Sequence, residues 1–200
     1  MLKNKLILLF IFISPAFFSQ ERLLDSVALA SCQEYTDLKE ALTEPDNVVK
    51  LTLRKKKYKS FPKELYNFKN LQYLDLSKNE IKELPDSIVT FKNLQYLIVS
   101  KAGLVALPKN IGGLKNLRHL NVNQNEISVL PYSFGDLENL EVADLWSNNL
   151  EYFPETMSKL KNLKLMDLRN ILIPQNHQDS IQSMLPQATI FFSPPCNCSW

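Results

Sequence analysis

Hydrophobic and polar residues repeat along most of this chain with a period of 23 residues. Five consecutive windows align without a gap, at residues 48–70, 71–93, 94–116, 117–139 and 140–162, and a partial sixth window begins at Leu163. Two residue types return at a fixed place in every full window: Pro62, Pro85, Pro108, Pro131 and Pro154, and Asn70, Asn93, Asn116, Asn139 and Asn162. Self-similarity of this kind predicts a solenoid in which each repeat packs only on its neighbours.

Each window opens with a short alternation of apolar and outward-facing residues. In the second window Leu71, Leu74 and Leu76 occupy the inward positions, and this period of two predicts a short strand. Leu84 and Ile88 point back toward the same interior, so the second half of the window predicts a return segment. Strands stacked in parallel about 4.8 Å apart predict a continuous sheet on the concave side, because the return segments need more room.

An asparagine recurs at the ninth position of several windows. Asn79, Asn125 and Asn148 are predicted to point inward and to hydrogen-bond loop backbone that would otherwise be buried without a partner. Lys56 and Ala102 occupy this position in the first and third windows, where we expect looser turns.

These columns resemble the pattern LxxLxLxxNxLxxLPxxIxxLxx of leucine-rich-repeat (LRR) proteins, a subclass found in animal signalling scaffolds and in many bacterial proteins. The resemblance covers residues 48 to about 173. It implies an α/β fold, a right-handed solenoid with a curved parallel sheet on the concave face and short helical or irregular return segments on the convex face. The flanking segments resemble the ends of exported bacterial members.

The chain divides into five expected parts. The N-terminal cap is predicted to contain a helix over residues 37–42, begun by Thr36 or Asp37 and stopped before Pro45. The C-terminal cap is predicted to contain a helix from Asp179 to Leu185 and a last strand from Ala188 to Phe192. The parts are a signal peptide (1–19), a helical cap (20–47), the repeats (48–173), a second cap (174–192) and a flexible tail (193–200).

The first 19 residues are typical of a secretory signal peptide. Lys3 and Lys5 precede an uncharged apolar run over residues 6–18, which is too short for a comfortable membrane span. We therefore expect an exported protein that is periplasmic, on the outer surface or secreted, with cleavage near Ser19. An uncleaved interfacial anchor is the alternative.

Three cysteines, Cys32, Cys196 and Cys198, cannot all pair within one chain. Residues 29–32 resemble a bacterial lipoprotein box in which Cys32 would be lipidated, although charged residues separate the box from the apolar run. The alternative is a helical capping segment that contains a cysteine. Cys32 lies too far along the solenoid from the other two to form a disulfide, and a Cys196–Cys198 ring would be small and strained.

Charge and motif content exclude several functional classes. The chain has 23 Lys and Arg and 21 Asp and Glu, and removal of residues 1–19 leaves 21 of each, which argues against a nucleic-acid partner. The sequence has no phosphate loop, zinc spacing or calcium loop, and neither of its two histidines has a predictable nucleophile beside it. We therefore expect no enzyme activity, cofactor or metal. Asp144 and Asp167 fall on neighbouring strands and are expected to form a solvated, mildly repulsive pair, with cation binding as the alternative.

The register fixes which side chains line the concave sheet. Trp146 is the strongest candidate anchor, because an exposed tryptophan on a rigid sheet is typical of interfaces; the alternative is that the capping region covers it. The Lys55, Lys78 and Lys101 column could attract an anionic partner or could be a solvated face. The predicted partner-binding residues are Tyr73, Tyr96, Ile98, His119, Asn121, Asp144, Trp146, Asp167 and Arg169.

The sequence favours a non-catalytic protein–protein interaction module whose concave sheet binds a macromolecular partner. A protein is the expected partner, and a glycan is the alternative. A membrane contact is expected only if Cys32 is lipidated or the N-terminus stays uncleaved. Two further hypotheses are a structural spacer or surface-coat element and a lipid-anchored surface receptor or adhesin. An appended catalytic domain is not expected, because few residues follow the last repeat.

Overall fold

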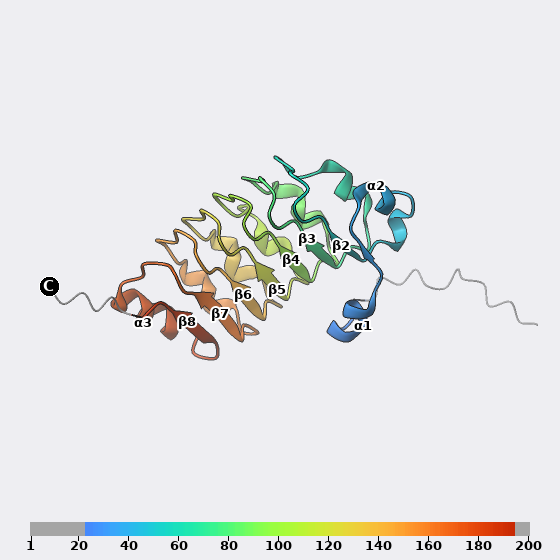
Figure 1. Cartoon of the computed structure of the whole chain (residues 1–200). Coiled ribbons are helices and arrows are strands. Elements are labelled where there is room, and N and C mark those ends of the chain that lie inside the picture. The colour runs from blue at the N-terminus through green and yellow to red at the C-terminus, as the bar shows by residue number, and fades with distance from the viewer. Residues whose placement is uncertain (1–22, 195–200) are drawn as a thin grey trace, which may run out of the picture.

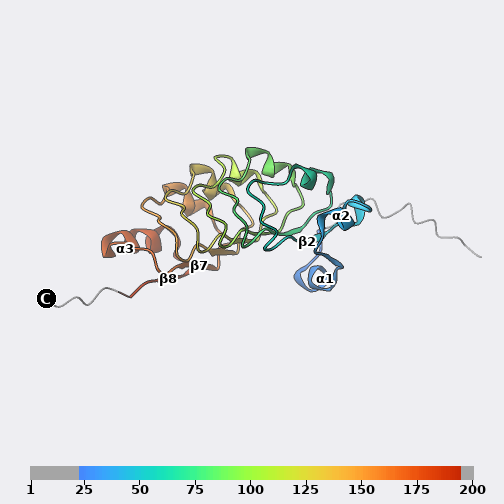
Figure 2. The same cartoon turned by 45° about the horizontal axis from the view of Figure 1, so that its top comes forward.

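The computed structural model describes residues 23–194, so the predicted signal peptide, Cys196 and Cys198 lie outside the described residues. The described residues form one eight-stranded parallel sheet whose spatial order follows the sequence. Its strands lie side by side along one face of an elongated molecule, and short helical segments line the opposite face (Figures 1 and 2). The predicted α/β solenoid is thereby confirmed: six strands come from the windows, one is the predicted last strand within residues 188–192, and one, at residues 34–35, was not foreseen.

The elements alternate strand and return helix along the repeats. The strands are β1 (Glu34–Tyr35), β2 (Lys50–Thr52), β3 (Tyr73–Asp75), β4 (Tyr96–Ile98), β5 (His119–Asn121), β6 (Val142–Asp144), β7 (Leu165–Leu168) and β8 (Thr189–Phe192). The α-helices are α1 (Ser26–Ser31), α2 (Leu38–Ala41) and α3 (Gln175–Met184). The return segments carry the 3-10 helices η2 (Pro45–Asn47), η3 (Lys63–Asn67), η4 (Asp86–Thr90), η5 (Ile111–Gly113), η6 (Tyr132–Asp136) and η7 (Glu155–Lys159).

Strand register confirms the predicted phase. Tyr73 on β3 pairs with Tyr96 on β4, and Leu74 pairs with Leu97 in the same ladder. Leu74 and Leu97 are fully buried, whereas Tyr96 and Trp146 remain partly exposed. The alternation therefore separates a buried apolar core from a solvent-exposed face, as a strand period of two requires.

The recurrent prolines precede the return helices: four of the five are the N-cap residue, whereas η5 begins at Ile111, three residues after Pro108. Proline fixes φ near −65° and its carbonyl still accepts a hydrogen bond, which suits the first position of a short 3-10 turn. Pro131, with φ of −68°, accepts the backbone N–H of Phe134 at 2.8 Å. The residue that donates this bond is fully buried in every full repeat: Leu65, Ile88, Ile111, Phe134 and Met157.

The predicted inward asparagines are confirmed, and each one joins two repeats. The Asn125 Oδ1 accepts the backbone N–H groups of Ala102 and Leu104, both at 3.0 Å. Its Nδ2 donates to the carbonyls of Val99 at 2.7 Å and Val122 at 2.8 Å. The side chain therefore satisfies backbone groups of the preceding repeat as well as its own.

Turns without this asparagine differ in backbone conformation. In the first and third repeats, where Lys56 and Ala102 replace it, the tenth position adopts a left-handed conformation, with φ of 61° at Lys57 and 79° at Gly103. Within residues 23–194 the three repeats that carry the asparagine have no left-handed residue at that position. The missing side chain thus goes with a different turn conformation, whereas the expected looseness of these turns stays a prediction.

The asparagines that close each window form a second ladder. Asn116 Nδ2 donates to the carbonyl of Lys92 at 2.8 Å, and Asn139 Nδ2 donates to the carbonyl of Lys115 at 2.9 Å. Asn70, Asn93 and Asn162 make the equivalent bond to the preceding repeat. Their 23-residue recurrence therefore has a structural cause that the sequence pattern alone did not reveal.

The two ends of the solenoid depart from the predictions in detail. Asp37 caps α2 by accepting the N–H groups of Lys39 and Glu40, as expected. Helix α1, which Cys32 ends, matches the alternative of a helical capping segment at this cysteine, whereas β1 was not foreseen. Helix α3 begins at Gln175 and not at Asp179, because Pro174 supplies the start of the helix (φ −56°) ahead of three exposed polar residues. None of the helices in residues 23–194 is long and apolar enough to cross a membrane.

Candidate partner-binding surface

The residues at the third position of the 23-residue windows form a ladder of rings across the concave face. The Tyr73 and Tyr96 ring centroids lie 5.7 Å apart at an interplanar angle of 32°, and the Tyr96 and His119 centroids lie 4.4 Å apart at 8°. Lys50 Nζ lies 5.4 Å from the Tyr73 centroid, a cation–π distance. These rings are held by neighbouring strands, and all three are partly exposed. We call Lys50, Tyr73, Tyr96 and His119 the aromatic ladder.

Mutual packing determines the chemistry of the aromatic ladder. Burial raises the pKa of Tyr73, and nearby Asp75 adds to the effect. Burial lowers the pKa of His119, an effect that Glu141 opposes and Arg118 reinforces. His119 is therefore a neutral imidazole and Tyr73 a neutral phenol near pH 7.

Apolar residues extend the aromatic ladder toward the C-terminal repeats. Val142 on β6 pairs with His119, and Leu165 on β7 pairs with Val142; both side chains are partly exposed. Phe191 on β8 lies in the neighbouring outward column, where it pairs with Asp167; it is 41% exposed, and the Arg169 guanidinium lies 5.5 Å from its ring centroid. These three residues were not among the predicted contacts, although the period of two along the last predicted strand would have located Phe191.

A network of amides and a carboxylate occupies the fifth and seventh positions of the 23-residue windows. Asp144 Oδ2 accepts the Nδ2 groups of Asn121 at 2.9 Å and Asn123 at 2.6 Å. Asp144 Oδ1 accepts the backbone N–H of Trp146 at 3.2 Å. Burial raises the Asp144 pKa, although the hydrogen bond from Asn123 works in the opposite direction. Within residues 23–194 Asp144 forms no ion pair, so this network holds a fixed carboxylate at the surface.

The expected solvated pair of Asp144 and Asp167 is not formed. The two residues are strand partners, but Asp167 is only 8% exposed and is paired with Arg169, whose Nε donates to Oδ1 at 3.0 Å. Burial acts to raise the pKa of Asp167, but the Arg169 hydrogen bonds outweigh it and the pKa is lowered. Arg169 thus covers the carboxylate, and in this part of the face the guanidinium is the exposed group. The described residues contain no cluster of three or more potential metal ligands.

Trp146 and Ile98 lie where the register placed them, partly exposed on the concave side. The Trp146 backbone carbonyl accepts the Gln124 N–H at 2.8 Å, so β-type pairing extends past β6 and fixes the residue. Of the nine predicted contacts, Asp167 is the one that is buried. The other eight side chains share one side of the sheet.

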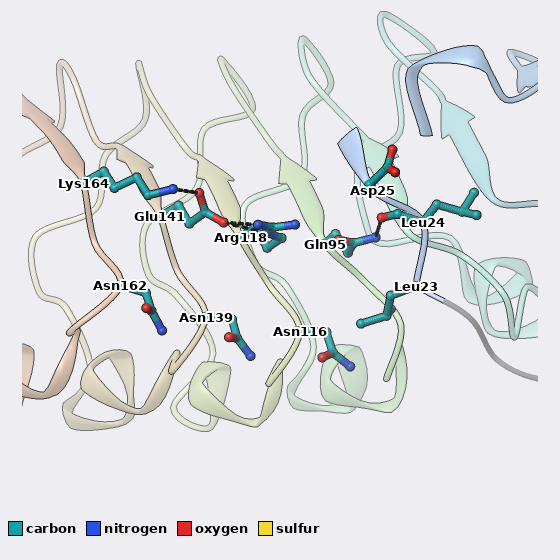
Figure 3. A pocket seen from close by; sticks show the side chains of 10 residues that line it. All are labelled: Leu23, Leu24, Asp25, Gln95, Asn116, Arg118, Asn139, Glu141, Asn162 and Lys164. Carbon is teal, nitrogen blue, oxygen red and sulfur yellow. Dashed lines mark hydrogen bonds and ion pairs between the residues drawn. The ribbon is translucent and has the colours of Figure 1, made fainter. Parts of the chain in front are cut away.

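A polar groove of about 540 Å³ runs along the edge where the strands begin. Figure 3 shows its lining: Arg118, Glu141 and Lys164 in one row, Asn116, Asn139 and Asn162 in another, and Gln95 with Leu23, Leu24 and Asp25 at one end. Glu141 binds both cations, through Oε1 to Arg118 and through Oε2 to Lys164, and the hydrogen bond from Lys164 is the main cause of its lowered pKa. The charges of this groove therefore largely neutralise one another.

Comparison with known proteins identifies the sequence pattern. A family model described as "Leucine-rich repeat region" matches residues 27–120, and one described as "Leucine Rich Repeat" matches residues 116–137. The comparison with curated protein sequences finds no match.

Several solved structures share the fold. An LRR protein of Leptospira interrogans is 29% identical with a TM-score of 0.65, over 81% of this chain and 49% of its own. An internalin from Listeria monocytogenes is 20% identical with a TM-score of 0.61, over 72% of this chain and 41% of its own, and shows the fold alone. A third structure is the LRR ectodomain of the plant membrane receptor kinase GASSHO1 from Arabidopsis thaliana, in complex with Casparian strip integrity factor 2. It is 27% identical with a TM-score of 0.57, over 67% of this chain and 17% of its own. This chain spans about half of the Leptospira protein and less of the others.

Proposed function

Because this chain belongs to the leucine-rich-repeat family, whose fold is commonly a protein-binding module, we propose that it is a non-catalytic protein–protein interaction module. Its concave face binds the partner, and the protein acts outside the cytoplasm. The export proposal is supported by the signal-like residues 1–19 and by the ectodomain among the similar structures.

The observation that carries the proposal is a continuous stripe of partly exposed rings and apolar side chains on a rigid sheet. Tyr73, Tyr96, His119, Val142 and Leu165 occupy one column across five strands. At a strand spacing of about 4.8 Å the stripe is roughly 20 Å long, which suits a standard protein interface of about 800 Å² per partner. Aromatic anchors on a preorganised surface are typical of interface hot spots.

Ring orientation favours a protein partner over a glycan. Sugar recognition by aromatic residues uses open ring faces, whereas the Tyr96 and His119 faces cover each other at 4.4 Å. The ladder therefore offers ring edges and a narrow apolar ridge to the partner. Such a ridge suits the apolar side chains and backbone of a polypeptide.

A substitution at Trp146 tests whether the partner binds on the concave face. We expect Trp146→Ala to weaken partner binding more than tenfold, about 1.4 kcal/mol, while the melting temperature stays nearly unchanged. The partner would first be identified by proximity labelling with the tagged chain in the organism that makes it. Affinity would then be measured by calorimetry for the wild-type protein, Trp146→Ala and the control Tyr132→Ala, which alters an exposed ring on η6.

Equal affinity of Trp146→Ala and the wild-type protein would refute the site. A monomer that captures no partner from its native envelope would instead support the spacer or surface-coat hypothesis. Lipid attachment at Cys32, a half-buried residue that follows α1, is tested separately by intact-mass measurement of the native protein.

A further inference from the structure

One edge of the sheet carries lysines in only half of its repeats. The six-residue connections that follow β2, β3 and β4, residues 54–59, 77–82 and 100–105, contain seven lysines, and the equivalent residues 123–128, 146–151 and 169–174 contain none. We call this group the lysine edge: Lys55, Lys56, Lys57, Lys59, Lys78, Lys82 and Lys101. The repeats are otherwise alike, so the solenoid architecture does not require these lysines.

The lysine edge forms no close ion pair within the described part of the chain, although the charge of Lys56 contributes to the lowered pKa of Asp37, after the backbone hydrogen bonds from Glu40 and Lys39. All seven side chains are exposed, and none forms an ion pair within residues 23–194. By contrast, Arg118 and Lys164 at the opposite edge share Glu141, and Arg169 is paired with Asp167. Like charges held close together repel one another, so an anion from outside the chain would relieve this repulsion.

Backbone geometry makes part of the lysine edge a regular array. Lys55, Lys78 and Lys101 have φ values of 56°, 57° and 53°, in the left-handed region that bulky residues seldom adopt. Their N–H groups donate to carbonyls of the next repeat, for example from Lys78 to Ser100 at 2.7 Å. The three side chains therefore start from equivalent, fixed positions about one strand spacing apart, roughly 4.8 Å.

The lysine edge is continuous with the concave face. Arg54 directly precedes Lys55 and binds Asp75 of β3 at 3.3 Å, and Lys50 lies on Tyr73 at the start of the aromatic ladder. A partner on the ladder would thus extend over the lysines without leaving the surface. Lysine is a flexible point charge and tolerates varied carboxylate positions, whereas arginine would favour fixed bidentate pairs.

We infer that the lysine edge binds an acidic polypeptide segment of the partner that docks on the concave face. This inference rests on the proposed function, and it adds that the partner binds in one direction, with its acidic segment over the first three repeats. Complementary charge of this kind accelerates association and fixes register. An acidic polypeptide is favoured over a polysaccharide because the Tyr96 and His119 ring faces already cover each other.

The test uses fluorescently labelled poly-L-glutamate as the probe and the full chain as the protein. Binding would be measured by anisotropy at low and at high ionic strength for the wild-type protein and two triple variants. The first is Lys55→Gln, Lys78→Gln and Lys101→Gln. The matched control is Lys92→Gln, Lys109→Gln and Lys161→Gln, which removes the same charge from exposed residues of the return segments.

We expect the lysine-edge variant to lose about tenfold or more in affinity at low salt and the control less than about twofold, with binding weakened by salt. Equal losses in both variants would overturn the inference, because net charge alone would then explain binding. Binding to heparin without binding to poly-L-glutamate would also overturn it and would indicate an anionic polysaccharide. Trp146→Ala should leave poly-L-glutamate binding unchanged, so this inference and the proposed function can fail separately.

Discussion

Asn125 offers the most direct test of what holds adjacent repeats together. Replacement by alanine removes five hydrogen bonds to backbone groups, three in the preceding repeat and two in its own repeat. Asn125 is only 7% exposed, so water has little access to the groups left behind. Ala102 already occupies the equivalent position one repeat earlier, which leaves Asn125 as the asparagine that serves the turn at residues 102–104.

The expected loss follows from the cost of unsatisfied backbone. Each buried donor or acceptor without a partner costs roughly 1–3 kcal/mol, and partial rearrangement reduces the sum. We therefore expect Asn125→Ala to lower the free energy of unfolding by about 4 kcal/mol, a large fraction of the 5–15 kcal/mol typical of a domain. With a urea dependence of about 2 kcal/mol per molar, the midpoint should fall by about 2 M.

Urea denaturation followed by far-ultraviolet circular dichroism would measure this loss. The matched control is Asn149→Ala, because Asn149 is exposed and its side chain makes no hydrogen bond within residues 23–194; its midpoint should stay within the range of ordinary surface changes, about 0.5 kcal/mol. An Asn125→Ala loss below about 1 kcal/mol, with an unchanged slope, would refute the proposed role of the asparagine.

Three further predictions concern close packing, a left-handed turn and pH. Gly135→Ala should destabilise by about 3 kcal/mol in the same urea assay, because its Cβ would lie 2.0 Å from the Thr156 carbonyl oxygen; a wild-type midpoint would contradict this packing. Gly103→Ala should cost only about 1–2 kcal/mol, since its surroundings are open and the cost comes from its φ of 79°; a loss as large as that of Gly135→Ala would refute this cause. Burial lowers the pKa of His119 in the folded protein. The imidazole of the unfolded chain therefore binds a proton at a higher pH than that of the folded protein, and stability should fall as pH decreases below about 6.5. His119→Gln should remove that fall, measured by urea titration between about pH 7 and pH 5, and a pH dependence equal to that of the wild-type protein would contradict the assignment.

The repeat register could be predicted because the same requirement, burial of apolar side chains, recurs in every repeat. Every inward column must bury an apolar side chain, so Leu74 and Leu97 determine which residues face out, and the tyrosines between them follow. The role of Asn79 could be predicted for a related reason, since a polar side chain among apolar columns has to satisfy backbone.

Departures from the predictions have local physical causes. Asp75 and Asp167 occupy outward positions yet are buried, because Arg54 and Arg169 lie over their carboxylates. The period of two along a strand predicts the direction in which a side chain points, but it does not predict whether a long neighbouring side chain covers it. The bounds of helix α1 could not be predicted, because it buries only Leu29 and so has no apolar periodicity, although Asp25 caps it.

Covalent capture of the partner tests the central claim most directly. A photo-crosslinking amino acid would be introduced singly at Val142 and Leu165 on the concave face, and at Tyr132 and Tyr152 on the return side, in the organism that makes the protein. If the sheet is the binding surface, the concave positions should yield the same crosslinked partner and the return-side positions should yield none. Crosslinks from Tyr132 or Tyr152, with none from Val142 and Leu165, would show that the solenoid binds through its other face.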